Sequence, residues 1–171
     1  MTILAARPSV GKTAMAHQIL RHAATQGHVG LFASLEQPTS DLADRAIAAT
    51  AKICGQMYRT GKALVGDEPA RVVDALDTLR GLRFFYDDTP AQSALHILGT
   101  ARGIKRKGPL SLVIVDYLQL VAPDDSRSNR NDQIDSVTRR IREMARELNV
   151  AVLALSQLSR DCEKQNRRPR L

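Results

Sequence analysis

A short run near the N-terminus combines residue types that bind phosphate. Residues 6–13 read ARPSVGKT and lie between an apolar segment, Thr2–Ala6, and a segment with helical periodicity. The pattern G-x-x-x-x-G-K-[ST] between a strand and a helix is typical of phosphate-binding loops, and this run departs from it only by the alanine at its first position. Alanine suffices there if its φ stays negative, because the position only has to begin the loop. The run therefore predicts a loop that binds the phosphates of a nucleoside triphosphate.

Each position of the run has an expected contribution to this chemistry. Pro8 lacks an N–H, which leaves the backbone amides from Ser9 to Thr13 to surround a phosphate at the N-terminus of a helix. Lys12 would reach the β- and γ-phosphates, and the Thr13 hydroxyl would hold Mg²⁺. Gly-Lys-Thr also occurs by chance in turns between a strand and a helix, so the surrounding pattern decides the prediction. The expected nucleotide-binding residues in this run are Ala6, Arg7, Pro8, Ser9, Val10, Gly11, Lys12 and Thr13.

Three further polar residues stand where apolar runs end. Asp116 ends the apolar part of LSLVIVDYLQL, and a carboxylate at the end of a strand after such a loop is typical of a Mg²⁺ ligand, direct or through water. Glu36 follows the apolar part of LFASLEQP, and Gln157 ends AVLALSQ. We expect Glu36 to orient an attacking water and Gln157 to touch the γ-phosphate. Taken singly, each has the alternative of an ordinary strand-end residue, but together with the loop they predict an active site.

The elements that must position these residues alternate along the chain, which predicts an α/β fold with a mostly parallel central sheet and helices on both faces. Continuous apolar runs are typical of strands covered on both faces. The predicted strands are Thr2–Ala6, Val29–Leu35, Arg83–Asp87, Ser111–Leu120 and Val150–Ser156. The predicted helices are Gly11–Gln26, Ser40–Ala51, Glu68–Leu79, Pro90–Lys105 and Asp132–Leu148, the first ended by Gly27.

Composition narrows the classes of partner. The net charge of +7 favours a polyanion such as nucleic acid, although a solvated basic face explains it equally well. Only 4% of residues are aromatic, so a nucleic acid would be held by its phosphates rather than by base stacking. No apolar run approaches the roughly 20 residues of a membrane span, and we expect no membrane partner. The isolated Cys54 and Cys162 predict reduced thiols, and the four histidines have no metal-ligand spacing.

Six motifs together resemble the RecA-like P-loop motor domain of DnaB-type replicative helicases. They are ARPSVGKT, SLEQP, YRTGK, YDDTP, VIVDYLQL and ALSQLSR, in the family's order and at about its spacings. The resemblance implies ATP and Mg²⁺ as ligands. It implies that Lys12 binds phosphate, Thr13 binds Mg²⁺ and Asp116 is the Walker B acid. It also implies that Glu36 is the catalytic carboxylate and Gln157 the sensor of the γ-phosphate.

The resemblance further implies DNA unwinding coupled to ATP hydrolysis, by a homo-hexamer on single-stranded DNA in the cytoplasm of a bacterium or its phage. Primase and a helicase loader are the implied further partners. The family also has an N-terminal domain, a linker helix, a later DNA-contacting loop and an arginine finger without counterparts here. We therefore expect a partial domain, residues 1–171, with a flexible basic tail at 159–171, monomeric and weakly active alone. No arginine of the chain is an obvious substitute for the finger.

Two alternatives stay open at this point. One is a nucleotide-binding module without helicase activity, and the other is a different RecA-like DNA-dependent ATPase, which SLEQP and DYLQL disfavour. The loop Pro123–Asn131, with Arg127 and Arg130, corresponds to a loop that faces the central channel of ring motors. It is either a contact for DNA phosphates or an ordinary surface loop.

Overall fold

The central feature of the computed structural model is a five-stranded parallel sheet. The structure describes residues 1–61, 63–123 and 129–158. The strands run in the order β1-β5-β4-β2-β3, and every pair of neighbours is parallel, as the continuous apolar runs predicted. Their bounds are β1 Thr2–Ala6, β2 Gly30–Ser34, β3 Phe84–Asp87, β4 Leu112–Asp116 and β5 Ala151–Gln157.

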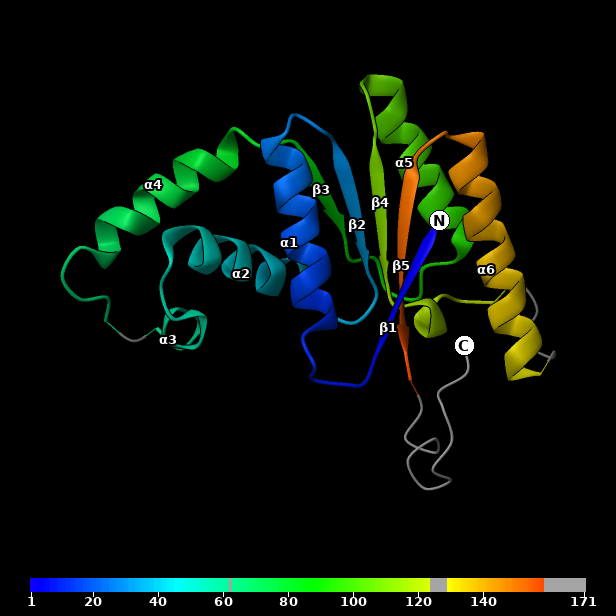
Figure 1. The fold of residues 1–171 in the computed structure, drawn as a ribbon, viewed down its shortest axis with the longest axis horizontal. Coiled ribbons are helices and arrows are strands. Elements are labelled where there is room, and N and C mark those ends of the chain that lie inside the picture. Colours follow the sequence, from blue (N-terminus) through cyan, green and yellow to red (C-terminus); the bar gives the residue numbers. More distant parts are fainter. Residues whose placement is uncertain (62, 124–128, 159–171) are drawn as a thin grey trace.

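Helices cover both faces of this sheet (Figure 1). They are α1 Lys12–Thr25, α2 Thr39–Ala51, α3 Gly55–Arg59, α4 Glu68–Arg80, α5 Ala94–Lys107 and α6 Arg130–Glu147, with a short 3-10 helix, η1, at Leu118–Leu120. Helix α1 packs on one face, and α5 and α6 pack on the other. Helices α2, α3 and α4 extend sideways beyond α1 (Figure 1).

The two cores explain why β4 is apolar at every position before Asp116. In β4, Val113 and Val115 belong to the core under α5 and α6, whereas Ile114 belongs to the core under α1. Successive side chains of a strand point to opposite faces, so a strand covered on both sides needs an apolar residue at each position. Residues Leu112–Asp116 are all buried. The fold class predicted from sequence is thus confirmed. Gly27, predicted to end the first helix, follows α1 with a positive φ.

Several elements differ from the prediction. The strand predicted at Ser111–Leu120 ends at Asp116, and Leu118–Leu120 form η1 instead. Leu118 is buried in the core although it lies in η1 and not in the sheet. Its apolar side chain therefore indicated burial but not strand structure. Helix α3 was not predicted, because five residues are too few to show a helical period. Helix α6 begins at Arg130 rather than Asp132.

Candidate active site

Most of the predicted nucleotide-site residues line one cavity at the carboxyl edge of the sheet, where ligands of parallel α/β folds bind. Strand register brings the ends of the strands together there: Ala6 lies beside Gln157, and Ser34 lies beside Asp116. The cavity has a volume of about 360 Å³. It is lined by Arg7, Pro8, Ser9, Gly11, Lys12, Thr13, Ala14, Glu36, Gln37, Arg45 and Gln157. Ala6, Val10 and Asp116 are not among the residues that line it.

The loop between β1 and α1 has the backbone geometry of an anion cradle. Ser9 and Gly11 have positive φ angles of 63° and 96°. Ala6, the last residue of β1, has no positive φ, which is the condition under which alanine can begin the loop. Gly11 is the N-cap of α1 and offers no side chain to cap it. The first N–H groups of a helix have no acceptor within the helix. They are therefore ready donors to a phosphate in the cavity, aided by the helix dipole.

Asp116 is buried beside this loop. Only 1% of it is exposed, and its Oδ2 accepts a 2.6 Å hydrogen bond from Thr13 Oγ1. Its Oδ1 has no hydrogen-bond partner among the described residues. Burial raises the pKa of Asp116 above its usual value, an effect only partly offset by Thr13 and Lys12. A hard cation fits this arrangement, because Mg²⁺ prefers carboxylate and hydroxyl oxygens and would satisfy the unpartnered one.

Lys12 is the last but one residue of the phosphate-binding run and the first residue of α1. Burial lowers its pKa below the usual value, while the charges of Asp116 and Glu36 act in the opposite direction. Its Nζ is 4.4 Å from the centroid of the Tyr117 ring, a cation–π distance. Phosphate oxygens in the cavity would raise the pKa of Lys12 again, because nearby negative charge favours the protonated ammonium.

Glu36 and Gln157 come from two different strand ends. Ser34 Oγ donates to the carbonyl of Gln37 at 2.6 Å and accepts from Gln37 N–H at 3.3 Å, which shapes the turn that carries Glu36. Glu36 is exposed to the cavity rather than buried. Leu158 N–H donates to the carbonyl of Ala6 at 3.1 Å, so Leu158 lies beside the start of the phosphate loop. Val10, in contrast, points to solvent with 69% of its surface exposed.

Arg45 is the residue that sequence reasoning missed. It lies in α2 and lines the cavity together with Arg7 from the loop. Burial raises the pKa of Asp116, and the charge of Arg45 opposes that rise, so the two groups interact electrostatically. The sequence offered no arginine as an obvious substitute for the finger, and Arg45 is a candidate that only its place in the cavity lining brings forward. Arg45 belongs to no short motif, so only the packing of α2 over α1 reveals it.

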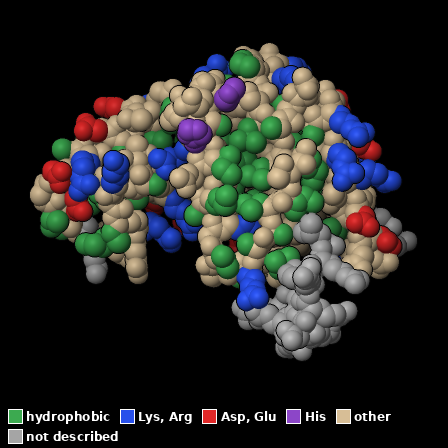
Figure 2. Space-filling view, viewed as in Figure 1, with side chains coloured by type: hydrophobic (Ala, Val, Ile, Leu, Met, Phe, Trp, Pro, Cys, Tyr) green, Lys and Arg blue, Asp and Glu red, His purple; other side chains and the backbone are tan. Residues whose placement is uncertain are grey.

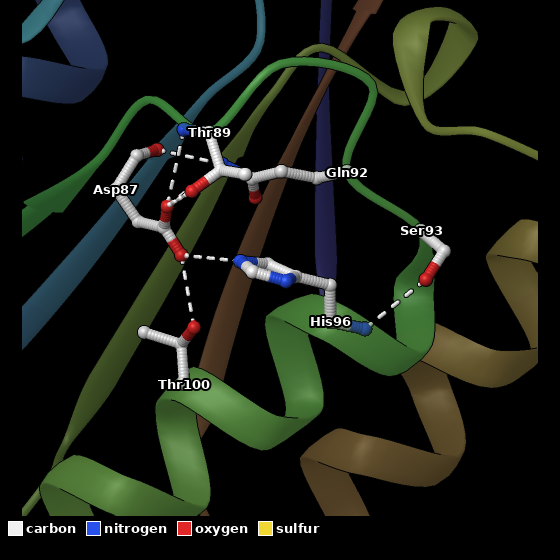
Figure 3. A network of polar contacts seen from close by, with 6 residues as sticks. All are labelled: Asp87, Thr89, Gln92, Ser93, His96 and Thr100. Atoms are coloured by element: carbon white, nitrogen blue, oxygen red, sulfur yellow. Dashed lines mark hydrogen bonds and ion pairs between the residues drawn. The ribbon is translucent and has the colours of Figure 1, made fainter.

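No residue of the YDDTP motif lines the cavity. Asp87 and Thr89 of this motif belong instead to a network of polar contacts (Figure 3). The carboxylate of Asp87, at the end of β3, accepts hydrogen bonds from Thr89 N–H, Thr89 Oγ1, Gln92 Nε2 and Thr100 Oγ1, and it pairs with His96 at 3.2 Å. Burial would raise its pKa, but these hydrogen bonds and His96 outweigh burial and lower it. Asp88 accepts from Thr39 N–H at 2.7 Å, at the first turn of α2. The motif thus fastens β3 to α5 and to the helix that carries Arg45.

The two arginines predicted to contact DNA have different outcomes. Arg127 lies outside the described residues, as do the tail at 159–171 and Cys162. Arg130 is the first residue of α6 rather than part of a loop, and its guanidinium donates to the carbonyl of Gln119 and to Gln133 Oε1. On the face shown in Figure 2, basic side chains lie on both flanks with hydrophobic ones between them, not in one stripe.

Three further features can be compared with the sequence: the cysteines, clusters of metal ligands, and membrane spans. Cys54 is a free, exposed thiol. Within residues 1–61, 63–123 and 129–158 there is no cluster of histidine, cysteine and acidic residues suited to a metal ion. Over the same residues, no helix combines the length and the apolar character that crossing a membrane requires.

Comparison with known proteins identifies the relatives of this arrangement. The family model for the DnaB-like helicase C-terminal domain matches residues 1–171. The chain is 38% identical over 173 residues both to the replicative DNA helicase DnaB of Geobacillus stearothermophilus and to the replicative DNA helicase DnaC of Bacillus subtilis. Each match covers 99% of this chain and 38% of the relative, so the chain spans well under half the length of these curated relatives.

Solved structures agree with the sequence relatives. A DnaB-like replicative helicase, reported with its interactions with primase, superposes with a TM-score of 0.92 at 33% identity, over all of this chain and 42% of its own. A second solved structure, of an ATPase domain, gives the same TM-score and identity, over 99% of this chain and 61% of its own. The chain belongs to the DnaB-like helicase C-terminal domain family.

Proposed function

We propose that the chain binds Mg²⁺·ATP at the cavity between β1 and α1 and hydrolyses it. The observation that carries this proposal is the contact between Thr13 and Asp116, 2.6 Å, at the mouth of a loop whose helix begins without a side-chain cap. It brings a hydroxyl, a buried carboxylate and free backbone donors around one point. Phosphate and a divalent cation are the ligands that this combination fits.

The residues around the cavity divide the work of phosphoryl transfer. Lys12 and the amides of residues 9–13 would hold the β- and γ-phosphates, and Thr13 and Asp116 would hold Mg²⁺, which neutralises charge on the phosphates when bound. Glu36 would accept the proton of an attacking water, for which its exposure to the cavity suits it. Gln157 and Arg45 line the same cavity and would contact the γ-phosphoryl group.

This chain covers 38% of the length of its curated relatives, which are replicative DNA helicases. We propose that it is the ATPase unit of a replicative DNA helicase, which in hexameric form unwinds DNA along a single strand. Primase, and by family resemblance a helicase loader, would be partners of the full assembly. Work on replicating DNA would place it in the cytoplasm of a bacterium or in phage replication. The alternative is a nucleotide-binding module without helicase activity.

Isothermal titration calorimetry on Lys12→Ala tests the proposal. We expect the parent chain to bind Mg²⁺·ADP and Mg²⁺·ATP, and the variant to bind at least about tenfold more weakly, since one charge-assisted contact of about 1.5–3 kcal/mol is lost. Lys52→Ala is the matched control, because Lys52 caps the far end of α2 and does not line the cavity. Unchanged affinity in Lys12→Ala would refute the assignment of the loop.

A further inference from the structure

The side-chain amide of Gln119 hydrogen-bonds to the end of β5 through both its nitrogen and its oxygen. Its Nε2 donates to Ser156 Oγ at 2.9 Å and to the carbonyl of Gln157 at 3.1 Å. Its Oε1 accepts from Gln157 N–H at 3.3 Å. Both backbone polar groups of Gln157 are therefore bonded to one side chain that is 38 residues away in the sequence.

These hydrogen bonds are possible because β5 is longer than β4. Pairing between the two strands ends at Val115 and Ala154, whereas β5 continues to Gln157. Beyond that point the ladder between β4 and β5 stops, because the chain turns into η1 after Asp116. On the other side, Gln157 remains paired with Ala6 of β1. The amide of Gln119 takes the place of the missing strand, since a primary amide has the same donor and acceptor as a backbone group.

A hydrogen bond from α6 fixes the turn that contains Gln119. The guanidinium of Arg130 donates to the carbonyl of Gln119. Burial raises the pKa of Tyr117, whose ring Lys12 contacts, and the charge of Arg130 acts in the opposite direction. Arg130 is exposed, at the first position of a helix. A continuous set of contacts thus joins the beginning of α6 to Gln157.

We infer that Gln119 is a positioning residue for ATP hydrolysis, which acts by holding the backbone of Gln157 so that its side chain points into the cavity, and that Arg130 holds the turn from which Gln119 acts. The inference rests on the proposed function. Gln119 does not itself line the cavity. It therefore contributes to turnover through Gln157 and not by contact with nucleotide.

A double-mutant cycle tests this role. Gln119→Met keeps the length of the side chain and removes its hydrogen bonds. We expect kcat for ATP to fall roughly tenfold, about 1.4 kcal/mol in the barrier, with the affinity for Mg²⁺·ADP and KM unchanged within about twofold. In a Gln157→Ala background, Gln119→Met should have no further effect on kcat, because its target is gone. Arg130→Leu should reproduce the pattern with a smaller fall.

The controls separate this inference from the proposed function and from a loss of stability. Gln56→Met changes an exposed glutamine of α3 and should leave kcat and affinity at parent values. Retained Mg²⁺·ADP affinity shows that each variant is folded. If the parent hydrolyses ATP and Gln157→Ala is impaired, parent-like kcat in Gln119→Met overturns the inference alone. So does a multiplicative loss in the double variant. A parent chain that does not hydrolyse ATP refutes the proposed function instead.

Discussion

At the level of single residues, Asp116 is a group of the site that lowers the stability of the folded chain. Its carboxylate is 1% exposed, and one of its oxygens is without a partner among the residues described. A buried charge that lacks full hydrogen bonding opposes folding, and burial accordingly raises its pKa. A cation beside the carboxylate would relieve this cost. The incompletely satisfied carboxylate is therefore the part of the structure that prepares the site for Mg²⁺.

This reasoning predicts that Asp116→Asn stabilises the nucleotide-free chain. Asn keeps an acceptor for Thr13 and removes the buried charge, so the free energy of unfolding should rise by about 1 kcal/mol at pH 7. Urea denaturation measures it. In calorimetry, Mg²⁺ should strengthen nucleotide binding by the parent but not by the variant. A variant that is less stable than the parent, and whose nucleotide affinity still responds to Mg²⁺, would speak against Asp116 as the metal acid.

Glu36 carries a different prediction, because its side chain is exposed and lines the cavity. Glu36→Gln should keep the affinity for Mg²⁺·ATP and lose about 10²–10⁴-fold in turnover, the usual contribution of a general base. Single-turnover hydrolysis beside calorimetry separates the two quantities. Turnover at the parent rate would require another base. Asp44→Asn, on α2 and outside the cavity lining, is the matched control.

At the level of elements, the end of β3 connects three parts of the fold. Asp87 receives its hydrogen bonds from α5 and the segment that leads into it, and Asp88 receives one from the first turn of α2. The position of α2 decides where Arg45 lies. The YDDTP segment therefore influences the site through packing, although none of its residues lines the cavity.

The hydrogen bonds to Asp87 predict a particular dependence of stability on pH. They outweigh burial and lower its pKa in the folded state, so its stabilising contribution is complete above the unfolded value of about 3.9 and is lost as pH falls through the lower folded value. Asp87→Asn should reduce the free energy of unfolding by about 1 kcal/mol at pH 7. Measured in urea, the difference from the parent should shrink below about pH 4.

The matched control is Asp77→Asn. Asp77 is paired with Arg80 on the surface of α4, where both side chains are mostly exposed, and such pairs contribute little. Its substitution should leave stability nearly unchanged at every pH. A difference between Asp87→Asn and the parent that stays constant down to about pH 2, below the range in which a carboxylate titrates, would show that ionisation of Asp87 does not stabilise the fold.

At the level of the whole molecule, the cavity contains two arginines of its own chain, Arg7 and Arg45, whereas ring motors take a further cation from the next subunit. An arginine finger is worth about 10³–10⁵ in rate, or about 4–7 kcal/mol. We expect the dilute chain to be monomeric and slow. Its specific ATPase activity should rise with protein concentration if a neighbour completes the site.

Sedimentation and steady-state ATPase assays over a wide range of protein concentration measure both quantities. Arg45→Ala distinguishes the two sources of cation. If fast turnover is independent of concentration and is abolished in Arg45→Ala, then Arg45 serves within one chain and the expectation of a slow monomer is wrong. Lys107→Ala, at the end of α5 and outside the cavity lining, controls for the loss of one positive charge.

The sequence by itself predicted the parallel sheet, the phosphate loop and the acid that closes the apolar run of β4, because each depends on a local pattern of apolar period or residue spacing. It did not predict that β4 stops at Asp116, since Leu118 is equally apolar whether it pairs in a strand or packs from η1. The places of Arg45 and Gln119 came only from the tertiary structure. Their contacts join residues tens of positions apart, and such contacts follow from strand order and helix packing, which leave no periodic trace in the chain.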